Sequence, residues 1–198
     1  MAGPAKVPLL GVAEAACIHS LHGVEKDYQK AFELFSKSAA QGNAWGQYGL
    51  GNCYYYGFGV AQDYDKAFAW FSKSAAQGYA GAQSSLGDCY YYGHGVGQDH
   101  SRAFEWFAKS AAQGNSNGQN SLGNCYYYGE GVDQDYEKAF EWYLKSAAQG
   151  NVAAQNSLGL CYYNGKGTTQ DRQKALEWFS KSESQGNPTK SQKKPRVR

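Results

Sequence analysis

Between residues 43 and 78, apolar and polar positions follow a helical period in two separate stretches. In the first stretch, Gly46, Leu50, Cys53 and Tyr54 have the i, i+4, i+7, i+8 spacing of one helical face. In the second stretch, a broad apolar face is formed by Ala67, Phe68, Trp70, Phe71, Ser74 and Ala75. The pattern predicts a first helix over 44–56 and a second helix that begins after residue 63.

The residues at the ends of these two stretches support the same boundaries. Asn43 and Asp63 are suited to cap the starts of the two helices. Gly57 and Gly59 break the first helix, because glycine adopts positive φ at little cost. Gly78 ends the second helix. Each segment of 36 residues is therefore predicted to form one pair of helices.

This 36-residue pattern recurs without insertion at 79–114, 115–150 and 151–186. A degenerate repeat over 7–42 keeps the register in its second half, but Glu14 stands where the other repeats have leucine. One helix pair cannot bury its apolar face alone, so we expect the repeats to stack. The sequence predicts an all-α fold, a right-handed α-solenoid of antiparallel helix pairs in a single domain over 7–186, with the repeat 7–42 either as a cap or as a docking surface for another domain.

Composition and charge narrow the classes of function. Apolar residues make up 42% of the chain, which is enough for a core, and no apolar run reaches the length of a membrane span. The net charge of +2 comes from a tail over 187–198, which we expect to be disordered and which carries Lys190, Lys193, Lys194, Arg196 and Arg198. Without these five, 14 basic residues face 17 acidic ones, so no nucleic-acid partner is expected. We expect a cytoplasmic protein, with the tail as a candidate nuclear-targeting or acidic-partner element or an aid to solubility.

The five cysteines follow the same period, at Cys17, Cys53, Cys89, Cys125 and Cys161. Their odd number and their distance from one another in a stack of helix pairs argue against disulfides, so we expect buried thiols in a reducing compartment.

The histidines do not share this period, and zinc needs about four clustered ligands, so no metal site is expected. The Gly-x-Gly sequences lack the third glycine and the strand of a dinucleotide loop, so no cofactor is expected. Because nearly every polar residue is copied in the next repeat, we expect no catalytic site.

The chain resembles the Sel-like repeat family, the 36-residue branch of the tetratricopeptide superfamily. The family pattern matches Leu86, Gly87, Cys89, Tyr90, Gly93, Gly95, Val96, Asp99, Ala103, Trp106, Phe107, Lys109, Ala111, Ala112 and Gly114, with Arg102 in place of lysine. The resemblance covers about 7–186 and implies an adaptor or scaffold that binds other proteins. Cysteine-rich secreted relatives carry paired cysteines in each repeat, whereas this chain has one per repeat, so it departs from that branch and from the β-lactam binding proposed for it.

On the first helix of each repeat, one face points away from the predicted core. The predicted partner-binding residues on this face are Tyr48, Asn52, Tyr55, Asp88, Tyr91, Asn120, Asn124, Tyr127, Asn156 and Tyr163, with Ser84 and Leu160 at equivalent positions. Tyrosine offers an apolar body with a polar tip, and asparagine can pair with the amides of an extended peptide. The competing interpretation is that four of the tyrosines pack between neighbouring repeats, namely Tyr55, Tyr91, Tyr127 and Tyr163.

The leading prediction is an interaction scaffold, not an enzyme, whose first-helix groove holds a partner peptide or domain. Two alternatives stay open: a small-molecule-binding or hydrolytic enzyme of the cysteine-rich kind, and an RNA-binding helical repeat, which would need a basic groove. The sequence leaves the partner's identity and the oligomeric state undetermined.

Overall fold

The structure is a computed structural model that describes residues 28–185. The chain divides into two compact units, 1–99 and 100–198, and each is described by itself. Two of the predicted features, the first half of the repeat 7–42 with Cys17 and the basic tail over 187–198, lie outside the described residues. The prediction of one solenoid domain over 7–186 stays a prediction.

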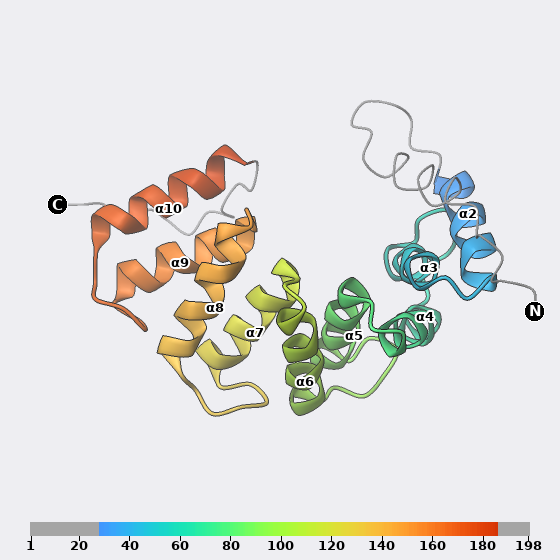
Figure 1. The fold of residues 1–198 in the computed structure, drawn as a ribbon, viewed down its shortest axis with the longest axis horizontal. Helices are drawn as coiled ribbons and strands as arrows, with labels where there is room; N and C mark the ends of the chain where they lie inside the picture. Colours follow the sequence, from blue (N-terminus) through green and yellow to red (C-terminus); the bar gives the residue numbers. More distant parts are fainter. Residues whose placement is uncertain (1–27, 186–198) are drawn as a thin grey trace, which may run out of the picture. The chain divides into compact units, whose positions relative to one another are not determined.

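The described residues form nine α-helices, each 13 residues long, joined by short loops. The first unit contains α2 (Tyr28–Ala40), α3 (Ala44–Tyr56), α4 (Tyr64–Ala76) and α5 (Ala80–Tyr92). The second unit contains α6 (His100–Ala112), α7 (Ser116–Tyr128), α8 (Tyr136–Ala148), α9 (Val152–Asn164) and α10 (Arg172–Ser184). Within each unit, consecutive helices lie side by side (Figure 1). The predicted all-α fold of stacked helix pairs, an α-solenoid with a 36-residue repeat, is confirmed.

The helices begin and end where the local sequence predicts. The Asn43 side chain accepts a hydrogen bond of 2.8 Å from the backbone N–H of Gly46, and Asp63 accepts one of 2.9 Å from that of Lys66. At the end of α3, Gly57 adopts a left-handed conformation with φ of 74°, and its N–H donates to the Cys53 carbonyl. Local capping chemistry therefore sets the helix lengths.

The second glycine of each Gly-x-Gly sequence has a role that the sequence did not predict. Gly59 also has positive φ, and a Cβ on it would lie 2.6 Å from the carbonyl carbon of Tyr28, at the start of the second helix of the preceding repeat. In the second unit, Gly131 lies equally close to the carbonyl group of His100. The loop after each of these first helices thus packs on the second helix of the preceding repeat, and only glycine fits.

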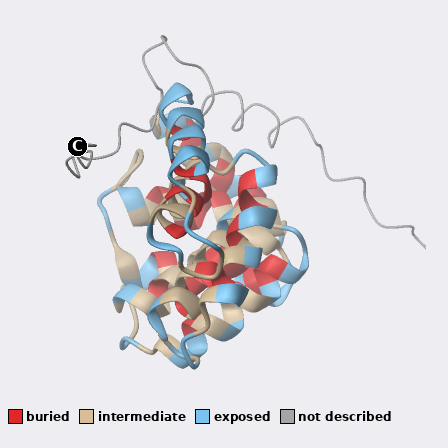
Figure 2. Cartoon of the chain, turned by 90° about the vertical axis from the view of Figure 1, so that its left-hand side faces the viewer, coloured by how far each residue is buried: buried red, intermediate tan, exposed pale blue. Residues whose placement is uncertain are grey.

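Small residues leave room for bulky side chains in the core. Leu50, Cys53, Ala67 and Phe71 are buried, and a Cβ on Gly51 would lie 2.6 Å from the Phe71 ring. Figure 2 shows the buried residues on the helix sides that face other helices, with exposed residues on the outer sides. Close approach of helix backbones therefore depends on glycine and alanine at fixed positions of the repeat.

Buried polar side chains tie the two helices of a pair together. The Ser74 hydroxyl donates a hydrogen bond of 2.7 Å to the Ala44 carbonyl, and Ser146 makes the equivalent bond to Ser116 in the second unit. The amide of Gln77 donates to Oε1 of the buried Gln47 at 2.8 Å. These bonds satisfy backbone and side-chain groups that burial would otherwise leave unpaired.

In the described part of the chain, no helix has the length and apolar character needed to cross a bilayer.

Candidate partner-binding surface

All ten predicted partner-binding residues lie on first helices, and all ten are half-buried. In the first unit they are on α3 and α5, and in the second unit on α7 and α9. None of the ten is fully exposed, and none is fully buried. The burial is compatible with both interpretations of these positions, and their role in binding stays a prediction.

Tyr55 combines internal packing with an accessible edge. Its ring lies 5.2 Å from that of Tyr64 and 6.0 Å from that of Phe71, both on the second helix of the same repeat. Its hydroxyl is in hydrogen-bond contact, at 2.9 Å, with Nδ1 of His94 in the next repeat. Burial, followed by the nearby charge of Asp88, raises the pKa of the Tyr55 hydroxyl. Tyr55 therefore links two repeats as well as facing the candidate surface.

Two other predicted tyrosines also pack against neighbouring aromatic rings. In the second unit, the Tyr127 ring lies 5.1 Å from that of Tyr136 and 6.4 Å from that of Tyr143. In the first unit, Tyr48 packs against Phe71 and, at 5.1 Å, against Tyr79. These tyrosines contribute to packing, so their removal would lower stability as well as change the surface.

The glutamine that follows each Gly-x-Gly loop fixes the end of the first helix. Its amide donates a hydrogen bond to the backbone carbonyl of the tyrosine that precedes it by 7 residues. The four bonds are Gln62 to Tyr55 at 2.7 Å, Gln98 to Tyr91 at 2.8 Å, Gln134 to Tyr127 at 2.9 Å and Gln170 to Tyr163 at 2.8 Å. The backbone carbonyls of Tyr91 and Tyr163 therefore accept the same hydrogen bond as those of Tyr55 and Tyr127.

The polar positions of the predicted face differ from repeat to repeat. Asn124 accepts a hydrogen bond of 2.7 Å from the hydroxyl of Tyr143, which accounts for its burial. The equivalent of Tyr143 in the first unit is Phe71, which has no hydroxyl, and the Asn52 side chain makes no hydrogen bond with another described residue. Asn52 is thus available to a ligand, whereas Asn124 is engaged.

The two remaining asparagines of the predicted set belong to the second unit. Asn120 and Asn156 are half-buried on α7 and α9. Oδ1 of Asn120 is buried and has no hydrogen-bond partner among the described residues.

The most exposed aromatic side chains are not among the predicted residues. Tyr56, Tyr92 and Tyr128 end α3, α5 and α7 and have relative exposures of 59%, 59% and 61%. They follow the predicted positions 52, 88 and 124 by one helical turn, so they lie on the same helical face. Extending the predicted face by one turn would have found them. Each of these three helices therefore presents an exposed tyrosine at its end.

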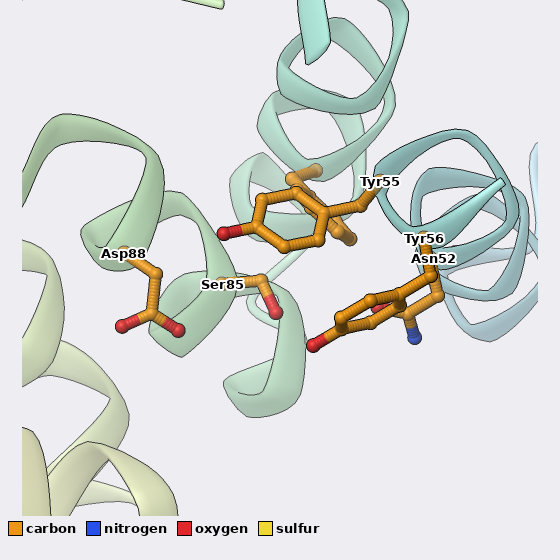
Figure 3. A pocket seen from close by; sticks show the side chains of 6 residues that line it. Asn52, Tyr55, Tyr56, Ser85 and Asp88 are labelled. Atoms are coloured by element: carbon orange, nitrogen blue, oxygen red, sulfur yellow. The ribbon is translucent and has the colours of Figure 1, made fainter. Parts of the chain in front are cut away.

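The first unit also contains a small polar pocket between α3 and α5, with a cavity volume of about 20 Å³. Its lining residues are Asn52, Tyr55, Tyr56, Phe71, Ser85 and Asp88. In Figure 3 the hydroxyl groups of Tyr55 and Tyr56 point from α3 toward α5, which carries Ser85 and Asp88. Burial raises the pKa of the Asp88 carboxyl to about 7.

The four cysteines among the described residues are buried, as predicted. Cys53, Cys89, Cys125 and Cys161 are buried thiols of the core. Burial raises the pKa of Cys53 to about 11 and that of Cys89 to about 12, so these thiols carry little nucleophilic thiolate at neutral pH. Within residues 28–185, no three His, Cys, Asp or Glu side chains are grouped so that they could hold a metal ion.

Comparisons with known proteins agree with this architecture. A family model for the Sel1 repeat matches residues 10–43, 46–79, 80–115, 116–151 and 152–187. Among solved structures, the chain is 37% identical, with a TM-score of 0.72, to c5321, a protective antigen of uropathogenic Escherichia coli strains with an SLR fold. That match covers 89% of this chain and 38% of the antigen, so the chain spans well under half of the antigen's length.

Two further solved structures are similar. A Sel1 repeat protein from Oxalobacter formigenes is 30% identical, with a TM-score of 0.79, over 91% of this chain and 72% of that protein. The immunity protein PA5088 from Pseudomonas aeruginosa shares the fold at 21% identity, with a TM-score of 0.62, over 93% of this chain and 68% of that protein. The comparison with curated proteins found no match.

Proposed function

The chain belongs to the Sel1 repeat family, and from that premise we propose that it is a protein-binding module, not an enzyme, which holds a segment of a partner on the exposed face of its first helices. One observation carries the proposal. Tyr56, Tyr92 and Tyr128 are exposed large aromatic side chains that recur at one position of the repeat. Tyrosine is enriched among the residues that dominate binding energy at protein interfaces.

The polar residues one turn before these tyrosines support the same function. The Asn52 amide, which no described residue engages, lies on the same face as Tyr56, and Asp88 precedes Tyr92 in the same way. An extended peptide has backbone donors and acceptors that an amide side chain can pair with. The face thus offers apolar contact area and hydrogen-bonding groups side by side, as peptide recognition requires.

The experiment that tests this function compares two variants of the full chain. The test variant carries Tyr56→Ala, Tyr92→Ala and Tyr128→Ala. The control variant carries Leu144→Ala and Leu176→Ala, which remove two exposed apolar side chains from the second helices α8 and α10. Both variants should fold like the wild type by circular dichroism, because none of the five residues is buried.

Affinity capture identifies the bound protein, and isothermal calorimetry with the purified pair measures the dissociation constant. We expect the tyrosine variant to bind at least about 30-fold more weakly, which corresponds to roughly 2 kcal/mol. The leucine control should bind as the wild type does. Equal affinity of the tyrosine variant and the wild type would refute the proposed surface, and a loss confined to the leucine variant would place the partner on the second helices.

A further inference from the structure

Asp88 is an acidic residue at a position that is otherwise neutral. The equivalent residues are Asn52, Asn124 and Leu160. The Asp88 side chain is half-buried, and no described residue gives its carboxylate a hydrogen bond or an ion pair. Partial removal of a carboxylate from water without a partner costs free energy, and burial is the cause of its raised pKa. Such a group is stabilised by a cation supplied from outside the chain.

The pocket beside Asp88 presents oxygen atoms from two helices. Ser85 and Asp88 contribute theirs from α5, and Asn52, Tyr55 and Tyr56 contribute theirs from α3. Figure 3 shows the two tyrosine hydroxyls directed toward the α5 side of the pocket. No lysine or arginine is among the described residues that line it. The pocket therefore has acceptors and a negative charge, and its own side chains provide no positive group.

We propose that this pocket binds the primary ammonium group of a lysine side chain in the partner segment. The inference rests on the proposed function and names the chemistry of that partner. An ammonium is a compact charge with three donors, which suits a small pocket lined by one carboxylate and several neutral oxygens. Phe71 lines the pocket from the second helix, and its apolar ring strengthens the attraction between the two charges by lowering the local dielectric constant. The exposed Tyr56 stands beside the pocket, where the lysine methylenes would pass.

The test uses n-butylammonium chloride, which is the lysine side chain without its backbone, as the probe. The full chain with 13C-labelled tyrosine and aspartate is titrated at pH 8, where Asp88 is ionised, and NaCl keeps the ionic strength constant. We expect the NMR signals of Tyr55, Tyr56 and the Asp88 carboxyl to shift and saturate. Tetramethylammonium, which has no N–H donor, should bind at least about tenfold more weakly.

Two variants make the result specific to the pocket. Asp88→Asn places at this position the residue found at positions 52 and 124, so it suits the fold, and it should abolish the saturable shifts. Asp65→Asn removes the same charge from an exposed position in the first turn of α4 and should leave them unchanged. Shifts that persist in Asp88→Asn, or shifts that do not saturate in the wild type, would overturn the lysine site. Equal binding of tetramethylammonium would also overturn it, since recognition would then not use N–H donors.

The outcome of this titration is separable from that of the proposed function. The probe titration needs no partner, so a positive result stands even if the partner binds elsewhere. Conversely, a titration without saturable shifts overturns the lysine site and leaves the comparison of the tyrosine and leucine variants intact.

Discussion

Gly95 packs against the carbonyl group of Tyr64 so closely that a Cβ on the glycine would lie 2.6 Å from the carbonyl carbon. Beside it, the His94 ring lies parallel to the Tyr64 ring, with 4.2 Å between centroids and 7° between planes. The Gly-x-Gly loop that follows α5 is thus seated on the first residue of α4, in the preceding repeat. Contacts of this kind connect successive repeats through backbone geometry as well as through side chains.

We therefore expect Gly95→Ala to destabilise the protein by roughly 3 kcal/mol or more, because a left-handed residue would gain a Cβ and a backbone carbonyl would have to move. Gly78→Ala is the matched control, since Gly78 also has positive φ (87°) but a Cβ added there would meet no atom within 4 Å. That control should cost about 1–2 kcal/mol. Urea unfolding measures both, and equal losses would show that the contact with Tyr64 contributes nothing.

The core of the second unit gives a second prediction. Leu122 on α7 is only 3% exposed, so Leu122→Ala should lower the free energy of unfolding by about 2–5 kcal/mol through lost burial and a cavity. Leu144→Ala, at an exposed position of α8, should change it by less than about 0.5 kcal/mol. Thermal or urea melts check this, and an unchanged melt for Leu122→Ala would contradict its place in the core.

The bond between Tyr143 and Asn124 predicts a specific pattern of coupling. Tyr143→Phe should cost about 0.5–1.5 kcal/mol, because the half-buried Asn124 loses its donor. The equivalent positions in the last repeat hold Phe179 and Leu160, so adding Asn124→Leu creates a pair that the chain already uses.

The double variant Tyr143→Phe with Asn124→Leu should recover part of that loss, since it leaves no unpaired amide at position 124. Urea unfolding of the two single variants and the double variant gives the coupling energy. Additive losses would mean that the hydrogen bond does not contribute to stability.

The raised pKa of Asp88 predicts how stability depends on pH. Its ordinary value is 3.8 and its value in the folded protein is about 7, so the folded state holds the proton more tightly than the unfolded state. The contribution of this group is therefore fully present below about pH 4 and is lost as the pH rises through about 7. Tyr55 and Tyr56, which line the same pocket, have hydroxyl pKa values raised above their ordinary value of 10 and stay neutral in this range.

Asp88→Asn removes that loss. We expect the variant to match the wild type near pH 4 and to exceed its stability by about 1–3 kcal/mol at pH 8. Urea unfolding at several pH values measures the difference, and a gap that stays constant with pH would show that Asp88 is not the titrating group.

Much of the architecture follows from local sequence. The 36-residue period, the caps Asn43 and Asp63 and the break at Gly57 predict α3 and α4 almost residue by residue, because hydrogen bonds within a few residues set helix ends. The burial of Cys53 and Leu50 follows from the same helical spacing. These features depend on neighbours along the chain, which the sequence displays directly.

The candidate surface is only partly predictable. Helical spacing places Tyr56 on the face that contains Asn52, but it does not show that Tyr56 is more exposed than Tyr55. Whether a tyrosine at the end of a helix is buried or exposed depends on which part of its side chain the neighbouring helices cover. The spacing of residues along one helix does not contain this information.

The repeat, the helix boundaries and the family could be derived without coordinates, since each depends on residue types and their spacing along the chain. Three relationships required the packed helices: Tyr143 engages Asn124, Gly59 packs on Tyr28, and Asp88 has no partner among the described residues. The first two join groups on different helices or loops that are distant in the sequence, and the third depends on which groups the neighbouring helices place near Asp88. Their physical basis is the packing of one helix on the next, which fixes distances that residue spacing along one helix does not contain.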